Sequence, residues 1–182
     1  MRGAVDSHLV IDAFAAEFRR YRSMSEKAAD QLNWDELRVP LDAETNSVAI
    51  IMKHLSGNLR SRWTEPFTTD GEKPWRNRDA EFVDDFKDRD ELNNAWRAGW
   101  SALESFLVKV SDAELARTLL IRNEPHTLAL ALVRSCTHAA YHAGQIVQVA
   151  RVLAARAGRD WNTLTIPRGG SVAFNASKGL PK

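Results

Sequence analysis

The apolar residues of this chain recur three and four positions apart in four long stretches, a spacing that predicts amphipathic α-helices rather than strands. We expect these helices at about residues 7–34, 42–63, 90–110 and 125–158, with Asp6 or Ser7 capping the first, Pro125 in the first turn of the fourth and Gly158 after its last turn. Amphipathic helices bury their apolar stripes against one another. The sequence therefore predicts an all-α fold, a four-helix bundle that forms a single domain over residues 1–182.

Two segments are longer than the connections that helical bundles usually have. Residues 64–88, between the second and third helices, mix aromatic side chains with charged ones. This segment is either a surface excursion held down by its aromatic residues, or a lid over one end of the bundle. In the lid, the charged residues point at a ligand, and aromatic residues such as Phe67 and Trp75 line the mouth of a pocket. Residues 160–182 contain glycine and proline, and we expect an irregular tail held to the bundle by Trp161, Ile166 and Phe174.

The charge and the apolar runs exclude several classes of partner. The 25 basic residues nearly balance the 24 acidic ones, which gives no electrostatic case for binding nucleic acid or an anionic membrane. No apolar run reaches the roughly 18 residues that a membrane-spanning helix needs. The segment MRGAVDSHLVIDAF meets charge too soon to resemble a signal peptide, and the single cysteine fits a reducing compartment. We therefore expect a cytoplasmic protein whose partner is a small molecule.

The segment CTHAAYHAGQ places His138 and His142 four residues apart in the middle of the fourth predicted helix, about 40° apart around its axis. Side chains at this spacing lie about 5–6 Å apart at Cβ, so they can bind one ion, but they can equally be core histidines with local hydrogen bonds. His54 lies on the flank of the second helix's apolar stripe, where it is either a third ligand or a boundary histidine. His8 and His126 fall near predicted helix starts, and we expect both in solvent.

With histidines at these places, and with the segments IIMKHLSGNLRSRW, TTDGEKPWRNRDAEF and LTIPRG, nearly the whole chain resembles the DinB/YfiT-like superfamily of bacterial metalloproteins. The three segments resemble one uncharacterised bacterial DinB-like subfamily within it. The resemblance implies that His54, His138 and His142 bind one divalent metal ion, with nickel or zinc the first choices. It also implies a homodimer and an enzyme such as a thiol-dependent S-transferase or isomerase that uses a low-molecular-weight thiol.

Three neutral imidazole ligands would leave the ion its full charge and an open coordination position, as in catalytic rather than structural metal sites. Such an ion lowers the pKa of a bound water towards about 7, which leads to hydrolysis, or binds a thiolate, which leads to thiol transfer. Three functions stay open at this point. They are a thiol-dependent S-transferase or isomerase, a metal-dependent hydrolase, and a non-catalytic metal-binding or ligand-binding bundle or scaffold.

Two residues of the fourth helix are weaker candidates for roles at the site. Gln145, one turn beyond His142, can orient a ligand or bind substrate, or it is a polar core residue bonded to a carbonyl. Arg134, one turn before His138, can bind an anionic group at the entrance of the site, or it is a helix arginine that extends to solvent. Tyr141 can donate a proton, but it is most simply a packed tyrosine.

The long connection and the single cysteine complete the candidates. Glu81, with Asp79 beside it, is a candidate base only if residues 64–88 fold back over the bundle. Cys136 is about 160° around the helix from His138, so it faces away from the histidines and is expected to be neither ligand nor nucleophile.

Overall fold

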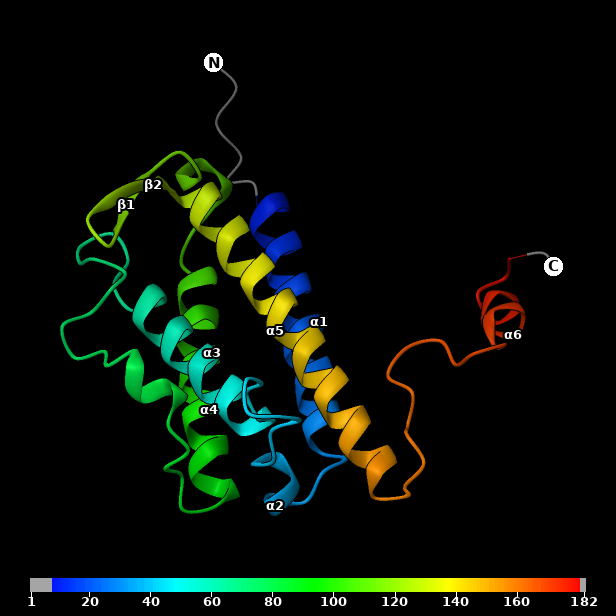
Figure 1. Cartoon of the computed structure of the whole chain (residues 1–182). Helices are drawn as coiled ribbons and strands as arrows, with labels where there is room; N and C mark the ends of the chain where they lie inside the picture. Colours follow the sequence, from blue (N-terminus) through cyan, green and yellow to red (C-terminus); the bar gives the residue numbers. More distant parts are fainter. Residues whose placement is uncertain (1–7, 181–182) are drawn as a thin grey trace.

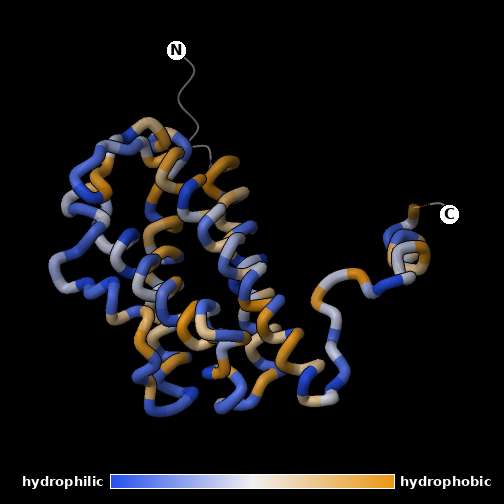
Figure 2. Tube along the Cα trace, viewed as in Figure 1, coloured by the Kyte–Doolittle hydropathy of each residue, from blue (hydrophilic) through white to orange (hydrophobic). Residues whose placement is uncertain are grey.

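The computed structural model describes residues 8–180, which form four long helices, several short ones and a β-hairpin (Figure 1). The long helices pack as a bundle in which α3 lies mainly against α4 and α1 mainly against α5, with further contacts between α3 and α5 and between α1 and α4. Hydrophobic and hydrophilic residues alternate along each long helix (Figure 2). The predicted all-α fold is confirmed. The long helices are α1 (Leu9–Ala29), α3 (Val48–Trp63), α4 (Arg89–Leu107) and α5 (Leu128–Arg156).

The directions of the helices explain the long connection at residues 64–88. Trp63, at the end of α3, stacks on Phe106, at the end of α4, with ring centroids 5.0 Å apart, so these neighbouring helices run parallel. Trp63 Nε1 also donates a hydrogen bond of 3.0 Å to Ser135 Oγ in the first turns of α5, so α3 and α5 run antiparallel. A chain that leaves one end of α3 must return along the bundle, about 24 Å for 16 residues, before α4 can begin beside it.

Local hydrogen bonds set the starts of the helices. Ser47 caps α3, which therefore begins at Val48 rather than near residue 42, because Asp42 instead accepts hydrogen bonds from the amides of the next turn. α1 ends at Ala29, and α2 (Trp34–Leu37) is a separate short helix opened by a capping box at Asn33. The predicted caps at residues 6 and 7 lie outside the described residues.

The predicted start of the fourth helix at Pro125 is wrong, because that proline lies in a hairpin. β1 (Thr118–Ile121) pairs antiparallel with β2 (Glu124–Thr127), and the turn between them holds Arg122 and Asn123 at φ 54 and 61. Thr127 then caps α5 by accepting from Leu130 N. Asp70 accepts hydrogen bonds from the amides of Arg122 and Asn123, which ties the long connection to the hairpin.

The core lies between the four long helices, and the backbones of α3 and α4 are in close contact at Gly99. A Cβ at this position would lie 2.6 Å from the carbonyl oxygen of Ser56, so a side chain there would push the two backbones apart. Trp100 and Leu103 are fully buried next to this contact. Two further short 3-10 helices, η1 (Asp79–Phe82) and η2 (Asp112–Glu114), lie in the connections on either side of α4.

The C-terminal segment is only partly held by the aromatic residues expected to hold it. α5 ends at Arg156, and Gly158 follows with φ 69, as predicted. Trp161 packs against the core, which confirms its predicted role. Ile166 and Phe174 are 39% and 43% exposed, and a further short helix, α6 (Ser171–Ser177), stands away from the bundle (Figures 1 and 2). Within residues 8–180, every helix is too short or too polar to cross a membrane.

Candidate metal centre

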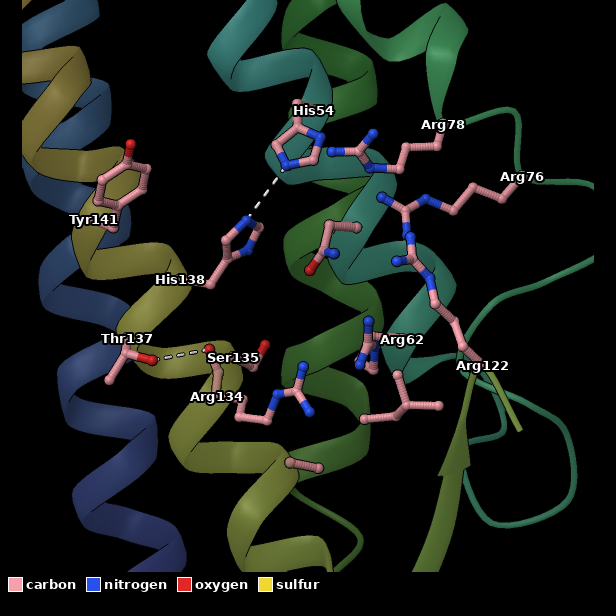
Figure 3. A pocket seen from close by; sticks show the side chains of 13 residues that line it. His54, Arg62, Arg76, Arg78, Arg122, Arg134, Ser135, Thr137, His138 and Tyr141 are labelled. Carbon is pink, nitrogen blue, oxygen red and sulfur yellow. Dashed lines mark hydrogen bonds between the residues drawn. The ribbon is translucent and has the colours of Figure 1, made fainter. Parts of the chain in front are cut away.

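Three histidines from α3 and α5 meet at one point. His54 Nε2 lies 3.3 Å from His138 Nε2, which lies 2.9 Å from His142 Nε2. The potential ligand atoms of all three lie within 4.8 Å of one another, and His54 and His138 face each other between the helices (Figure 3). His54 is buried and the other two are half-buried. The structure thus brings together the three residues that the sequence predicted as ligands.

The packing of α3 against α5 places these side chains. The Trp63–Ser135 hydrogen bond sets the register of the two antiparallel helices. It leaves His54, nine residues before Trp63, opposite the middle of α5, where His142 follows seven residues after Ser135. Phe82 of η1 stacks on the outer side of the His54 ring, with centroids 4.9 Å apart.

Acceptor groups orient two of the three imidazoles. Glu81 Oε2 lies 2.9 Å from His54 Nδ1, and Gln145 Oε1 lies 2.7 Å from His142 Nδ1. Because these oxygen atoms only accept, the partners assign the ring proton to Nδ1 and leave a lone pair on Nε2. Metal-bound histidines are commonly held in this way.

The donor set fits a divalent cation. Three imidazole nitrogens about 2.1 Å from a tetrahedral ion lie about 3.4 Å from one another. Here two of the three pairs lie 3.3 and 2.9 Å apart, and all three lie within 4.8 Å. Burial is the main cause that lowers the pKa of His138, to about 3, with His142 and His54 adding to it. Burial also lowers the pKa of His142, partly opposed by the hydrogen bond with Gln145. The His138 and His142 rings are therefore neutral near pH 7, as metal ligands must be.

Residues 64–88 do fold back onto α3, and Glu81 becomes a buried partner of His54. Its carboxylate also accepts hydrogen bonds of 2.7 and 2.9 Å from Arg76 Nε and Nη2. Burial acts to raise the pKa of Glu81, but the hydrogen bonds from His54 and Arg76 outweigh it. The pKa is therefore lowered, and the group is ionised. With both oxygens engaged, Glu81 orients His54 rather than serving as a free base, and Asp79 is exposed.

Gly57 makes room for this carboxylate, which sequence reasoning missed. A Cβ at Gly57 would lie 2.2 Å from Glu81 Oε1 and 2.8 Å from its Cδ. The glycine in the middle of the helical segment IIMKHLSGNLRSRW was the available signal, because glycine inside a helix weakens it unless something approaches closely.

A cavity of about 470 Å³ opens beside His54 and His138, between α3, α5, the hairpin and the long connection (Figure 3). Arg134 lines it, at the place expected for an entrance residue, and the hydroxyl of Tyr141 accepts a hydrogen bond from Gln145 Nε2. Tyr141 is 63% exposed, so the expectation of a packed tyrosine is wrong. The cavity is lined by His54, Asn58, Arg62, Arg76, Arg78, Ile121, Arg122, Ala131, Arg134, Ser135, Thr137, His138 and Tyr141.

The aromatic residues of the long connection do not line this cavity, so that part of the lid prediction is wrong. Phe67 packs on Phe106 with centroids 5.6 Å apart, beneath Arg117, and Trp75 is 51% exposed beneath Arg60. Each ring instead packs against the guanidinium of an arginine outside this cavity, Arg117 over Phe67 and Arg60 over Trp75, a favourable cation–π contact.

The other histidines and the cysteine lie apart from the centre. His8 is exposed as expected, whereas His126 is only 6% exposed and contacts Arg134, because β2 turns it under the start of α5. Cys136 is half-buried towards α1, where burial raises the pKa of its thiol and Glu17 adds to the effect, consistent with its predicted orientation.

Comparison with known proteins places the chain in a family. No match is found among curated proteins. A conserved protein from Enterococcus faecalis of solved structure is similar with a TM-score of 0.60 and 20% identity, over 79% of this chain and 96% of that one, which shows a shared fold. Residues 6–170 match the model of the family described as "Protein of unknown function (DUF1572)". Since that match covers most of the sequence, the chain belongs to the DUF1572 family.

Proposed function

We propose that the protein is a metal-dependent enzyme that acts on a small molecule, with His54, His138 and His142 as the ligands of one divalent cation, nickel or zinc. One observation carries this proposal. The Nε2 atoms of the three rings converge while Glu81 and Gln145 accept from the Nδ1 atoms of two of them. A cation between the rings would accept a lone pair from the Nε2 atoms that these two acceptors leave unprotonated.

When bound, such an ion supplies a Lewis acid with an open coordination position. The protein's own residues supply the rest. Glu81 and Gln145 keep the His54 and His142 rings in one tautomer and one orientation, and the cavity of about 470 Å³ gives a small molecule room beside His54 and His138. A cavity next to the ligands favours a catalytic site over a closed structural one.

The reaction that we put first is a thiol-dependent S-transfer or isomerisation with a low-molecular-weight thiol as cosubstrate. Its support is the resemblance to the DinB/YfiT-like superfamily. A homodimer in the cytoplasm belongs to the same proposal. A metal-dependent hydrolase would need no thiol, and a non-catalytic metal-binding bundle would turn over neither class of substrate.

Metal analysis of the purified protein tests the centre. We expect close to one equivalent of nickel or zinc in the wild type and in the matched control His8→Ala, whose ring is exposed at the start of α1. His142→Ala should lose most of the metal, because two ligands bind a cation far more weakly than three. A His142→Ala protein that keeps its full equivalent would reject the assignment.

Turnover assays with and without thiol separate the reactions. Metal-loaded protein that consumes an electrophile only when thiol is present, with activity lost in His142→Ala, supports the S-transferase. Ester hydrolysis without thiol supports the hydrolase. Full metal content with neither activity supports the binding bundle.

A further inference from the structure

The cavity beside the histidines gathers five arginines from four separate segments of the chain. One comes from α3, one from α5, two from the long connection and one from the hairpin turn, and Figure 3 shows their guanidinium groups around the same space. They are Arg62, Arg134, Arg76, Arg78 and Arg122.

This positive charge is only partly neutralised. Among the described residues, no carboxylate lines the cavity. Glu81 pairs with Arg76, and Glu72 lies 3.1 Å from Arg76 and 3.3 Å from Arg122. If each glutamate cancels one arginine, five minus two leaves three uncompensated positive charges beside the histidines.

Arg62 has a hydrogen-bond donor that no acceptor of the protein satisfies among the described residues. Its Nε is buried without a hydrogen-bond partner in the part of the chain that the structure describes. The stem is wedged against Gly71, where a Cβ would lie 3.0 Å from Arg62 Cδ. The pKa of Arg62 is lowered to about 10, mainly by burial, with the neighbouring Arg76 and Arg134 adding to the effect. A buried donor held among like charges is unfavourable until an anion meets it.

The spacing along the helices relates these arginines to the histidines. His54, Asn58 and Arg62 follow one another at intervals of four residues on one face of α3, so Arg62 lies about 12 Å along the axis from His54. On α5, Arg134 lies about 6 Å along the axis from His138. A small molecule about 6–12 Å long can therefore contact the histidines at one end and these arginines at the other.

We propose that the cavity binds the carboxylate or phosphate group of an anionic small-molecule substrate on Arg62, Arg122 and Arg134, while the opposite end of that molecule lies at the three histidines. This assignment rests on the proposed function, since it names the class of substrate for the same site. Arginine suits the role because its planar fork binds two oxygens of such an anion at once and keeps its charge when half-buried.

Calorimetric titration of inorganic phosphate and, separately, succinate into the protein at low ionic strength tests this. Arg62→Gln and Arg134→Gln should each weaken binding at least about tenfold, the loss expected for one charge-assisted hydrogen bond. The control Arg151→Gln, exposed on α5 outside the cavity, should bind within about twofold of the wild type. Stronger binding of one anion over the other identifies the substrate group as phosphate or carboxylate.

Each arm is run on metal-loaded and on chelator-treated protein, with metal content measured in the same samples. Arginine-dependent anion binding without any metal uptake supports the anion site and rejects the metal centre. Metal uptake with no binding of either anion, or binding that both arginine variants retain in full, overturns the anion site. Arg134 is exposed, so Arg134→Gln keeps the test valid if Arg62→Gln fails to fold.

Discussion

Replacing Gly57 by alanine tests the link between the long connection and the histidines without touching a ligand. In the middle of α3, alanine should favour the helix over glycine by about 1 kcal/mol. The new Cβ, however, would lie 2.2 Å from Glu81 Oε1, so the carboxylate must leave its position. The two effects have opposite signs, and their sum depends on how firmly Glu81 is held.

The contacts of Glu81 give the size of the second effect. Leaving one partner of a buried ion pair alone costs about 3–5 kcal/mol, and the side chain of Arg76 is only 2% exposed. Arg76 keeps Glu72 at 3.1 Å, so we take the lower end, about 3 kcal/mol. Subtracting about 1 kcal/mol for the helix leaves Gly57→Ala about 2 kcal/mol less stable than the wild type. Since His54 also loses its acceptor, metal affinity should fall about 10–100-fold.

Gly144→Ala is the matched control. Gly144 lies inside α5, and a Cβ there would meet nothing within 4 Å, so this variant should be stabilised by about 1 kcal/mol with unchanged metal affinity. Urea unfolding in chelator measures the first effect, and competition with a metal indicator measures the second. A Gly57→Ala protein that is stabilised as much as Gly144→Ala, with wild-type metal affinity, would refute the role given to Glu81.

The remaining predictions concern acid and chelation. Because the pKa of His138 is lowered from 6.5 to about 3 in the folded protein, the unfolded chain binds the extra proton between these values. The metal-free protein should therefore keep its free energy of unfolding above about pH 6.5 and lose at most about 2 kcal/mol of it at pH 5, less where solvent screens the imidazole. The His138→Gln protein should lose less than the wild type between these pH values. Equal losses in the two proteins would contradict this prediction. Chelator should lower the wild-type melting temperature at pH 7.5 and much less at pH 4.5, where protons displace the metal, and His54→Ala should respond little at either pH. A wild-type melting temperature indifferent to confirmed metal removal at pH 7.5 would reject the stabilising role of the ion.

The parts of the fold that were predictable depend on local patterns. The helical spacing of apolar residues indicates which face of α3 and α5 points inward, and that places His54, His138 and His142 near one another. The start of α5 was not predictable in this way, because Pro125 suits a first helical turn as well as an edge strand. Instead, β2 forms because it pairs with β1, and Asp70, 52 residues before Arg122, accepts the hydrogen bonds that hold the turn between the two strands.

The surroundings of the histidines depend on contacts that no local spacing encodes. Glu81 reaches His54 only because residues 64–88 return along α3, and this follows from the parallel order of α3 and α4. The arginines of the cavity are spread from Arg62 to Arg134 and come together only in three dimensions. The sequence therefore predicted the three histidines and the role of Gln145 on the same helix, but not that Glu81 would orient His54.

The parallel arrangement of α3 and α4 also bears on how the proposed site evolves. A connection that must pass along the bundle covers one side of α3, and here it contributes the acceptor for His54 and two cavity arginines from residues 76–81. Glycine stands at both points of closest approach, Gly57 under Glu81 and Gly71 against Arg62. A substitution in the connection can thus change the orientation of His54 and the charge of the cavity without disturbing the four-helix core.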